Sequence, residues 1–280
     1  MLAASLLFAC MGVCVKLSAD HFSANELIWW RGAIATALIL PWVLVTRSPL
    51  GTSLGTRFWR LHLVRGLSGV AALIFYFHAI TLIPLATAVT LNYTSPLFLG
   101  VLLHFGLKQR VSEQLRWAIA IGFVGLILVL RPSIASDQWL GALLGLGSGC
   151  IASIAYLTVR QLGEAGEPEW RTVFYFSLMS CLAGLPGLIT SAPLSAHSGK
   201  QWLVLIGIGL FGLAAQLCMT SAYRRGQPLV TASLSNSTVL FASAFGMVLW
   251  GEHLPVSAWV GVALIVAGGT LANLARPTIN

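Results

Sequence analysis

A run of 42 residues, Gly66–Leu107, contains no Asp, Glu, Lys or Arg. A helix that crosses a lipid bilayer needs roughly 20 predominantly apolar residues, so this run is long enough for two crossings and too long for one. Pro84 lies near its middle, and proline suits the first turn of a helix because its missing N–H would have no partner there. The run therefore predicts two transmembrane helices that meet at a turn around Pro84.

The rest of the chain has the same character. Of its 280 residues, 57% are hydrophobic and only 9% are charged, whereas soluble domains carry about 25% charged residues. The net charge of +8 does not indicate nucleic-acid binding, because the basic residues are scattered between apolar runs instead of forming a patch. We expect an all-α integral membrane protein whose main partner is the lipid bilayer. The charge-poor intervals predict ten transmembrane helices, at about residues 1–17, 26–46, 64–83, 85–106, 113–131, 138–159, 172–192, 201–223, 228–250 and 254–275.

The distribution of Lys and Arg predicts the orientation of these helices. Twelve of the 16 basic residues, Arg65 among them, fall on one side of the predicted membrane. The other side has Arg131, Lys200, Lys16 and Arg31, and we expect Lys16 to reach for the interface with its long side chain. Basic residues accumulate on the cytoplasmic side, so both termini are predicted to be cytoplasmic, in a bacterial inner membrane.

The segment around Asn92 is repeated in the second half of the chain. Five identical residue pairs are separated by 144 positions: Pro84/Pro228, Leu85/Leu229, Thr87/Thr231, Ala88/Ala232 and Asn92/Asn236. Pro41/Pro186 and Arg131-Pro132/Arg276-Pro277 follow at 145. The repeat predicts two five-helix units, residues 1–132 and 138–277. Because five is odd, the second unit enters the membrane inverted, an arrangement typical of secondary transporters with a binding site between the halves.

These features make the chain similar to the EamA-type transporters of the drug/metabolite transporter superfamily, over essentially its whole length. The similarity is carried by the doubled Pro-Leu-x-Thr-Ala segment, Gly251-Glu252, Gly261, Gly268 and an arginine followed by a glycine at Arg31. Lys108-Gln109 departs from the family pattern, in which many members have an acidic residue there. The resemblance implies that the first four helices of each half surround a central cavity and that the fifth buttresses it. It does not specify a substrate.

Polar residues inside the predicted spans are the candidate substrate-binding residues, because polar groups are costly in the bilayer and usually have a function there. Arg31 offers a planar guanidinium to a carboxylate or phosphate, and the two amides Asn92 and Asn236 lie equally deep from opposite faces. Hydrogen bonding between helices is the alternative for both amides and for His78, which otherwise suits a proton carrier. The full candidate set is Arg31, Tyr76, His78, Asn92, Tyr93, Tyr156, Gln216 and Asn236, with Pro96 as a candidate gating kink.

All eight acidic residues fall in connections or at span ends. The absence of a carboxylate at mid-membrane favours an anionic or zwitterionic substrate over a cation. We therefore expect a carrier for an amino acid or a similar small polar metabolite, with no metal and no cofactor. Uptake of a nucleotide-like, vitamin or S-adenosylmethionine-type compound is the alternative. A passive channel or an intramembrane enzyme is the alternative class, although no catalytic motif is present. The direction of transport and the choice between monomer and homodimer stay open.

Overall fold

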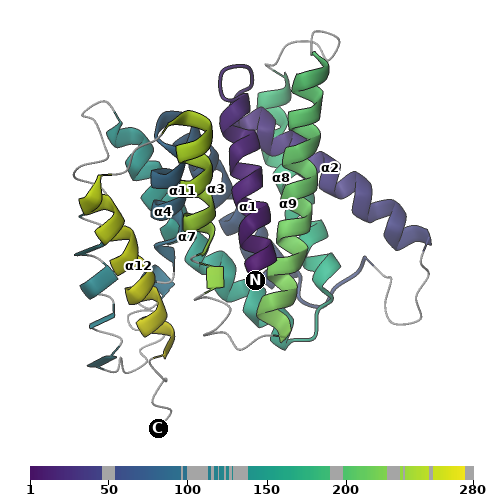
Figure 1. Cartoon of the computed structure of the whole chain (residues 1–280). Coiled ribbons are helices and arrows are strands. Elements are labelled where there is room, and N and C mark those ends of the chain that lie inside the picture. Colours follow the sequence, from purple (N-terminus) through teal and green to yellow (C-terminus); the bar gives the residue numbers. More distant parts are fainter. Residues whose placement is uncertain are drawn as a thin grey trace.

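The computed structural model is a bundle of helices (Figure 1), and the part of the chain that it describes contains no strand. The described residues are 1–45, 54–95, 97–99, 113–114, 117–118, 120–122, 124–125, 128, 138–189, 198–225, 234–235, 237–251 and 255–274.

The labelled helices agree with the predicted spans. They are α1 (Leu2–Ser18), α2 (Ala24–Val45), α3 (Trp59–Leu82), α4 (Leu85–Asn92), α7 (Trp139–Glu164), α8 (Glu169–Ile189), α9 (Gly199–Arg225), α11 (Ser237–Trp250) and α12 (Val256–Leu274). Residues 113–128 are helical wherever they are described, which supplies the fifth span. The prediction of ten helices is confirmed. One boundary was wrong in a way that matters: α3 begins at Trp59, five residues before the predicted start of that span.

The predicted turn at Pro84 is also confirmed. Helix α3 ends at Leu82, Ile83 is extended, and Pro84 directly precedes α4. Helix α4 is fully buried and ends at Asn92. Beyond it, the Thr94 hydroxyl donates to the carbonyl of Leu91 (2.6 Å), so a side chain satisfies a backbone group where the regular ladder is interrupted.

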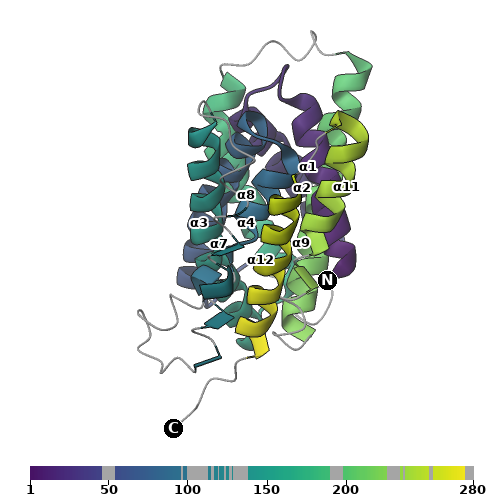
Figure 2. The same cartoon turned by 60° about the vertical axis from the view of Figure 1, so that its left-hand side comes forward.

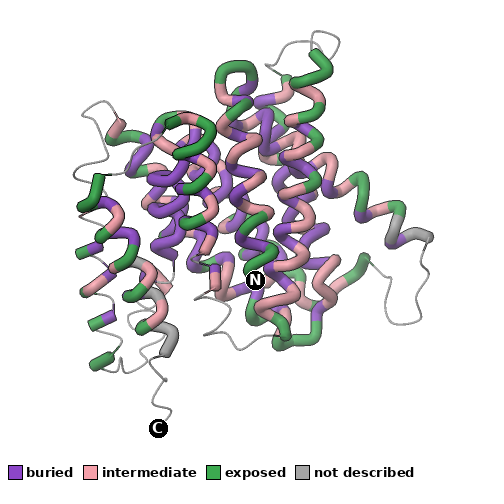
Figure 3. Tube along the Cα trace, viewed as in Figure 1, coloured by how far each residue is buried: buried purple, intermediate pink, exposed green. Residues whose placement is uncertain are grey.

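The outside of the bundle is apolar. Four helices, α3, α7, α8 and α9, are long and apolar enough to cross a membrane by length and composition. Their exposed faces carry large hydrophobic side chains; Leu203 is 72% exposed and Ile189 is 80% exposed. Figure 3 shows the buried residues gathered in the interior of the bundle, with exposed ones along its outer helices. Such a surface is unfavourable in water and favourable against lipid tails.

Helices α2 and α8 cross with their backbones in contact, and glycines make this possible. A Cβ at Gly32 would lie 2.5 Å from the backbone nitrogen of Cys181, and one at Gly184 would lie 2.5 Å from that of Trp29. Small residues permit such an approach between membrane helices. Pro41 and Pro186 lie within α2 and α8, each as the eighteenth residue of its helix.

The contacts between the two halves are nearly symmetric. If each helix is replaced by its counterpart in the other half, the same pairs of helices pack together. Helix α3 packs along α7 and α1 packs along α9, while α4 contacts α7 and α11 contacts α1. Gly141, Gly145 and Gly149 of α7 lie against the α3–α4 turn and α4, where side chains at these positions would collide with Ile83 and Leu91. Figure 2 shows α12 on the outside of the bundle, and a Cβ at Gly268 of α12 would lie 2.7–2.9 Å from backbone atoms of Ala118 and Gly122 in the fifth span.

Candidate functional site

A cavity lies between the two halves of the bundle. Its lining comes from α1 to α4 and from α7 to α9: Phe8, Met11, Arg31, Arg65, Gly69, Ala72, Leu73, Tyr76, Asn92, Tyr93, Ala152, Ala155, Tyr156, Phe176 and Gln216. The volume of the cavity that is open to the centres of water molecules is about 70 Å³. One water needs roughly 10–15 Å³ of such volume. The cavity therefore has room for several waters.

Arg31 extends into this cavity from the second turn of α2. Its side chain is only 1% exposed, and its guanidinium carbon lies 4.9 Å from the centre of the Phe176 ring. Nε and Nη1 have no hydrogen-bond partner among the described residues. Gly212 of α9 leaves room for it, because a Cβ there would lie 3.0 Å from Nε.

Arg65 is the second guanidinium of the cavity, and its predicted place on the cytoplasmic flank was wrong. Counted as a cytoplasmic flank, it is instead 3% exposed and lines the cavity from α3. The cause is the early start of α3: the charge-free run begins after Arg65, but the helix begins at Trp59. Aromatic residues are common at the membrane interface, so Trp59 was a better indicator of the start of α3 than the last charged residue was.

The Arg65 guanidinium is held on one side only. Nη2 donates to Oε1 of Gln216 on α9 (3.2 Å), and the guanidinium carbon lies 4.1 Å from the centre of the Phe176 ring. Nε and Nη1 lack a partner within the described structure. A Cβ at Gly69, one turn further along α3, would overlap Nη1, so this glycine keeps the space that the guanidinium occupies.

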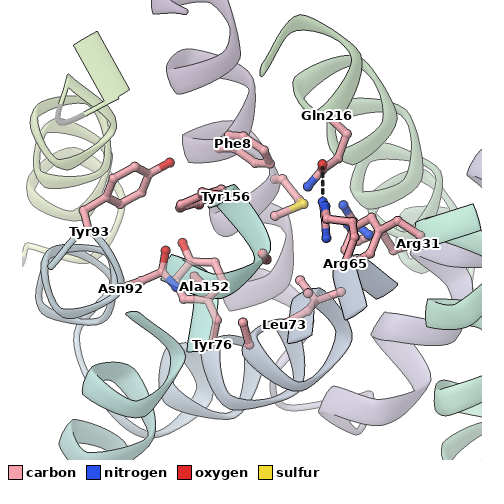
Figure 4. Close-up of a pocket in the computed structure, with 15 residues that line it drawn as sticks. Phe8, Arg31, Arg65, Leu73, Tyr76, Asn92, Tyr93, Ala152, Tyr156 and Gln216 are labelled. Carbon is pink, nitrogen blue, oxygen red and sulfur yellow. Dashed lines mark hydrogen bonds between the residues drawn. The ribbon is translucent and has the colours of Figure 1, made fainter. Parts of the chain in front are cut away.

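The opposite wall of the cavity is neutral and aromatic (Figure 4). Asn92, Tyr76, Tyr93 and Tyr156 lie there, away from the two arginines. Asn92 Nδ2 donates to Ser148 Oγ of α7 (2.9 Å), so this amide both joins two helices and borders the cavity. Tyr156 stacks on Tyr223 of α9, with ring centres 6.0 Å apart and planes 19° from parallel.

One described candidate, His78, is not brought to the cavity, and two further candidates are not described. His78 is half-buried on α3, is absent from the lining, and donates through Nδ1 to the carbonyl of Ile74 (2.8 Å). Asn236 and Pro96 lie outside the described residues. The structure therefore unites Arg31, Tyr76, Asn92, Tyr93, Tyr156 and Gln216 and adds Arg65 and Phe176 to them.

Lys16 also differs from its expected position. Its amine donates to the carbonyls of Ile83 (2.7 Å) and Ile80 (3.0 Å). These carbonyls belong to the last turn of α3 and the residue after it, where backbone acceptors have no intrahelical donor. Lys16 therefore bonds the free carbonyls at the end of α3 and does not extend to the interface as predicted.

No Asp or Glu lines the cavity as described. An acidic cluster lies at His62 of α3, one turn before Arg65. There Glu167 Oε1 accepts from His62 Nε2 (2.9 Å) and from Arg171 Nη1 (3.0 Å). Burial alone would raise the pKa of the Glu167 carboxyl, but the hydrogen bonds from His62, Arg171 and Thr56 hold it below its ordinary value. This cluster ties α3 of the first half to α8 of the second.

Local backbone geometry positions Glu167. Helix α7 ends in a Schellman motif: Gly166 has φ of 79°, its N–H donates to Gly163, and the Glu167 N–H donates to Leu162 (3.0 Å). A glycine is favoured at the positive φ. Pro168 then accepts from the N–H groups of Arg171 and Thr172, which starts α8 directly after the glutamate.

Among the described residues, no group of three or more His, Cys, Asp or Glu side chains is arranged to hold a metal ion. The side chains that line the cavity offer hydrogen bonding, charge pairing and aromatic stacking.

Comparison with known proteins yields one family. The EamA-like transporter family matches residues 1–131 and 139–274. The chain is 30% identical to the pseudopaline exporter of Pseudomonas aeruginosa (strain UCBPP-PA14), over 97% of this chain and 91% of that protein. It is 24% identical to the riboflavin transporter of Brucella anthropi, over 95% and 94%. A solved crystal structure with 20% identity has the same fold, with a TM-score of 0.68 over 98% of this chain and 97% of the other.

Proposed function

Because the chain belongs to the EamA-like transporter family, we propose that it is a carrier for a small polar metabolite with an anionic group. An amino acid or a similar anionic or zwitterionic compound has the required chemistry. The observation that carries this proposal is the buried Arg31 guanidinium, which borders the cavity with two unpartnered nitrogens. Relatives with named functions are transporters, among them the pseudopaline exporter and the riboflavin transporter.

The physical reason lies in the cost of a buried charge. Removal of a guanidinium from water costs several kcal/mol of free energy unless an anion and hydrogen-bond acceptors replace its hydration. Within the described lining no carboxylate does so. A carboxylate or phosphate of the substrate would supply both, and the bidentate geometry of arginine favours these groups.

Alternating access between the two sides of a bacterial inner membrane is the transport mechanism we propose. The small cavity lies between α1–α4 and α7–α9, so its enlargement requires movement of one half against the other. The exchangeable packing of the helices supports a pseudo-two-fold relation between residues 1–132 and 138–277. Both termini are then cytoplasmic by the distribution of basic residues, and Lys16 and Arg31 face away from that side.

A planar vitamin or nucleotide-like compound is a second candidate class of substrate. Tyr76, Tyr93 and Tyr156 line one wall, and aromatic rings bind planar molecules by stacking. A cationic sulfonium compound fits poorly, because the cavity already contains two guanidinium groups. Saturable flux with counterflow separates a carrier from a passive channel.

Transport by Arg31 variants in proteoliposomes tests the proposal. A panel of amino acids, vitamins and nucleotides is first screened for thermal stabilisation of the purified protein, and hits are measured for flux. Loss of a charge-assisted hydrogen bond costs about 1.5–3 kcal/mol, so Arg31→Ala should reduce transport of an anionic substrate about 10- to 100-fold. Arg31→Lys keeps the charge without the planar fork and should lose less.

The matched control is Arg160→Ala. Arg160 is half-exposed on α7 and pairs with Glu164 four residues later, well outside the cavity lining. Its removal should leave flux unchanged. Normal flux through Arg31→Ala protein present at the wild-type level would refute the proposed role of the arginine.

A further inference from the structure

Two guanidinium groups lie against one aromatic ring. Arg31 of α2 and Arg65 of α3 place their guanidinium carbons 4.9 Å and 4.1 Å from the centre of the Phe176 ring of α8. Figure 4 shows both side chains on the same side of the cavity, next to Gln216. Each favours a position over the electron-rich face of the ring, but the ring has no net charge to neutralise either cation.

Neither arginine has an acidic partner among the described residues. The described lining contains no Asp or Glu, and the only hydrogen bond from either guanidinium to a described residue is that of Arg65 to the neutral Gln216. Four nitrogens, Nε and Nη1 of each residue, remain without an acceptor although both side chains are at least 97% buried. Two like charges in a poorly hydrated site also repel each other.

The surrounding helices keep space for both groups. Gly212 of α9 leaves room for the Arg31 guanidinium, and Gly69 of α3 leaves room for that of Arg65. An alanine at Gly69 would displace Nη1 and would also lie 2.9 Å from the Phe176 ring. Four helices thus contribute to one doubly positive region, which is paired with the neutral tyrosine wall across the cavity.

We propose that the substrate has two negative charges, both bound at Arg31 and Arg65, and an uncharged polar or planar part that faces Asn92 and the tyrosines. This rests on the proposed carrier function and deepens it by naming the substrate class: a dicarboxylate or a phosphate monoester. A single carboxylate neutralises one guanidinium and leaves the other buried without a counter-charge. Two anionic groups satisfy both forks at once.

Ligand pairs in which one member carries an additional anionic group test this directly. Full-length protein in proteoliposomes is loaded with one compound, and counterflow is measured with glutamate against glutamine, aspartate against asparagine, and phosphoserine against serine. Wild-type protein should prefer the compound with the extra negative charge by at least about tenfold in at least one pair. A preference in the first two pairs identifies a carboxylate as the source of the charge, and a preference in the third pair alone identifies a phosphate.

Arg65 variants link the preference to the site. Arg65→Gln should bring the charged and neutral members of the preferred pair to nearly equal rates, and Arg65→Lys should retain part of the preference. Gly69→Ala keeps the arginine but displaces its guanidinium, and should also weaken the preference. Gly163→Ala is the control, because a Cβ there makes only ordinary contacts at 3.6 Å or more, outside the cavity.

The outcomes separate the two proposals. Equal wild-type rates within all three pairs, or preferential transport of the members without the extra anionic group, would overturn the doubly anionic substrate and leave an anionic or zwitterionic carrier standing. A preference that survives Arg65→Gln in well-folded protein would also overturn it. If compounds with two anionic groups are not transported while compounds with one are, the inference fails. Flux without saturation or counterflow would instead defeat the carrier itself.

Discussion

Replacement of Glu167 by glutamine should destabilise the protein measurably. The carboxylate is 5% exposed and accepts hydrogen bonds from His62 of α3 and Arg171 of α8. Glutamine preserves the shape but leaves the Arg171 charge facing a neutral amide. Breaking a buried ion pair by removal of one partner costs about 3–5 kcal/mol. Since the cluster lies at the helix ends, we expect the lower end of that range, about 3 kcal/mol.

Glu164→Gln is the matched control for this substitution. Glu164 lies three residues earlier and pairs with Arg160, but the two side chains are 61% and 49% exposed. Exposed pairs of this kind contribute about 0.2–1 kcal/mol. Unfolding of both variants is followed in detergent micelles by denaturant titration and thermal melting. An effect of Glu167→Gln no larger than that of Glu164→Gln would refute the structural role of the cluster.

The pH dependence provides an independent check. The pKa of Glu167 is lowered in the folded protein from its ordinary value of 4.5, so the folded state favours the charged carboxylate. The resulting stability is fully present above pH 4.5 and is lost as the pH falls through the lowered pKa. The difference in unfolding free energy between wild type and Glu167→Gln should therefore be constant near neutral pH and shrink below pH 4.5. A difference that does not shrink below pH 4.5 would contradict this assignment.

Two further predictions concern the α2–α8 crossing and the orientation of the chain. Gly184→Ala should lower the free energy of unfolding by about 1–3 kcal/mol, because the new Cβ meets the backbone of Trp29 at 2.5–2.7 Å. The melting temperature of this variant is compared with that of Gly163→Ala, and equal values would show that α2 and α8 separate without cost. A reporter fused after Asn280 should be active only in the cytoplasm, as the distribution of Lys and Arg predicts; activity on the outer side would invert the proposed orientation.

The sequence alone determined the class of the protein and the number of its membrane helices. Charge-free runs of sufficient length cannot be placed in water, and a proline that interrupts such a run predicts a turn. The turn at Pro84 is accordingly where it was predicted. The proline repeat also located equivalent positions in α2 and α8. These properties depend on local composition and backbone chemistry, both of which are contained in short segments of the sequence.

The composition of the cavity was predicted only in part. Six of the eight candidate residues line it, because polar side chains inside apolar spans are few and conspicuous. His78 was equally conspicuous but bonds to its own helix. Nothing in its neighbours along the chain distinguishes it from Tyr76, since helices that are apolar all round offer no periodic pattern to separate one face from another.

Only the tertiary structure brought Arg65 to Arg31. The two residues are on different helices, and their common contact is Phe176, more than 100 positions away in the other half of the chain. Whether a terminal arginine points to the interface or the interior depends on where its helix begins and on the glycines that make room for it. Gly69 and Gly212 make that room from α3 and α9. Such space exists only when the helices are packed, because it is a property of several segments at once.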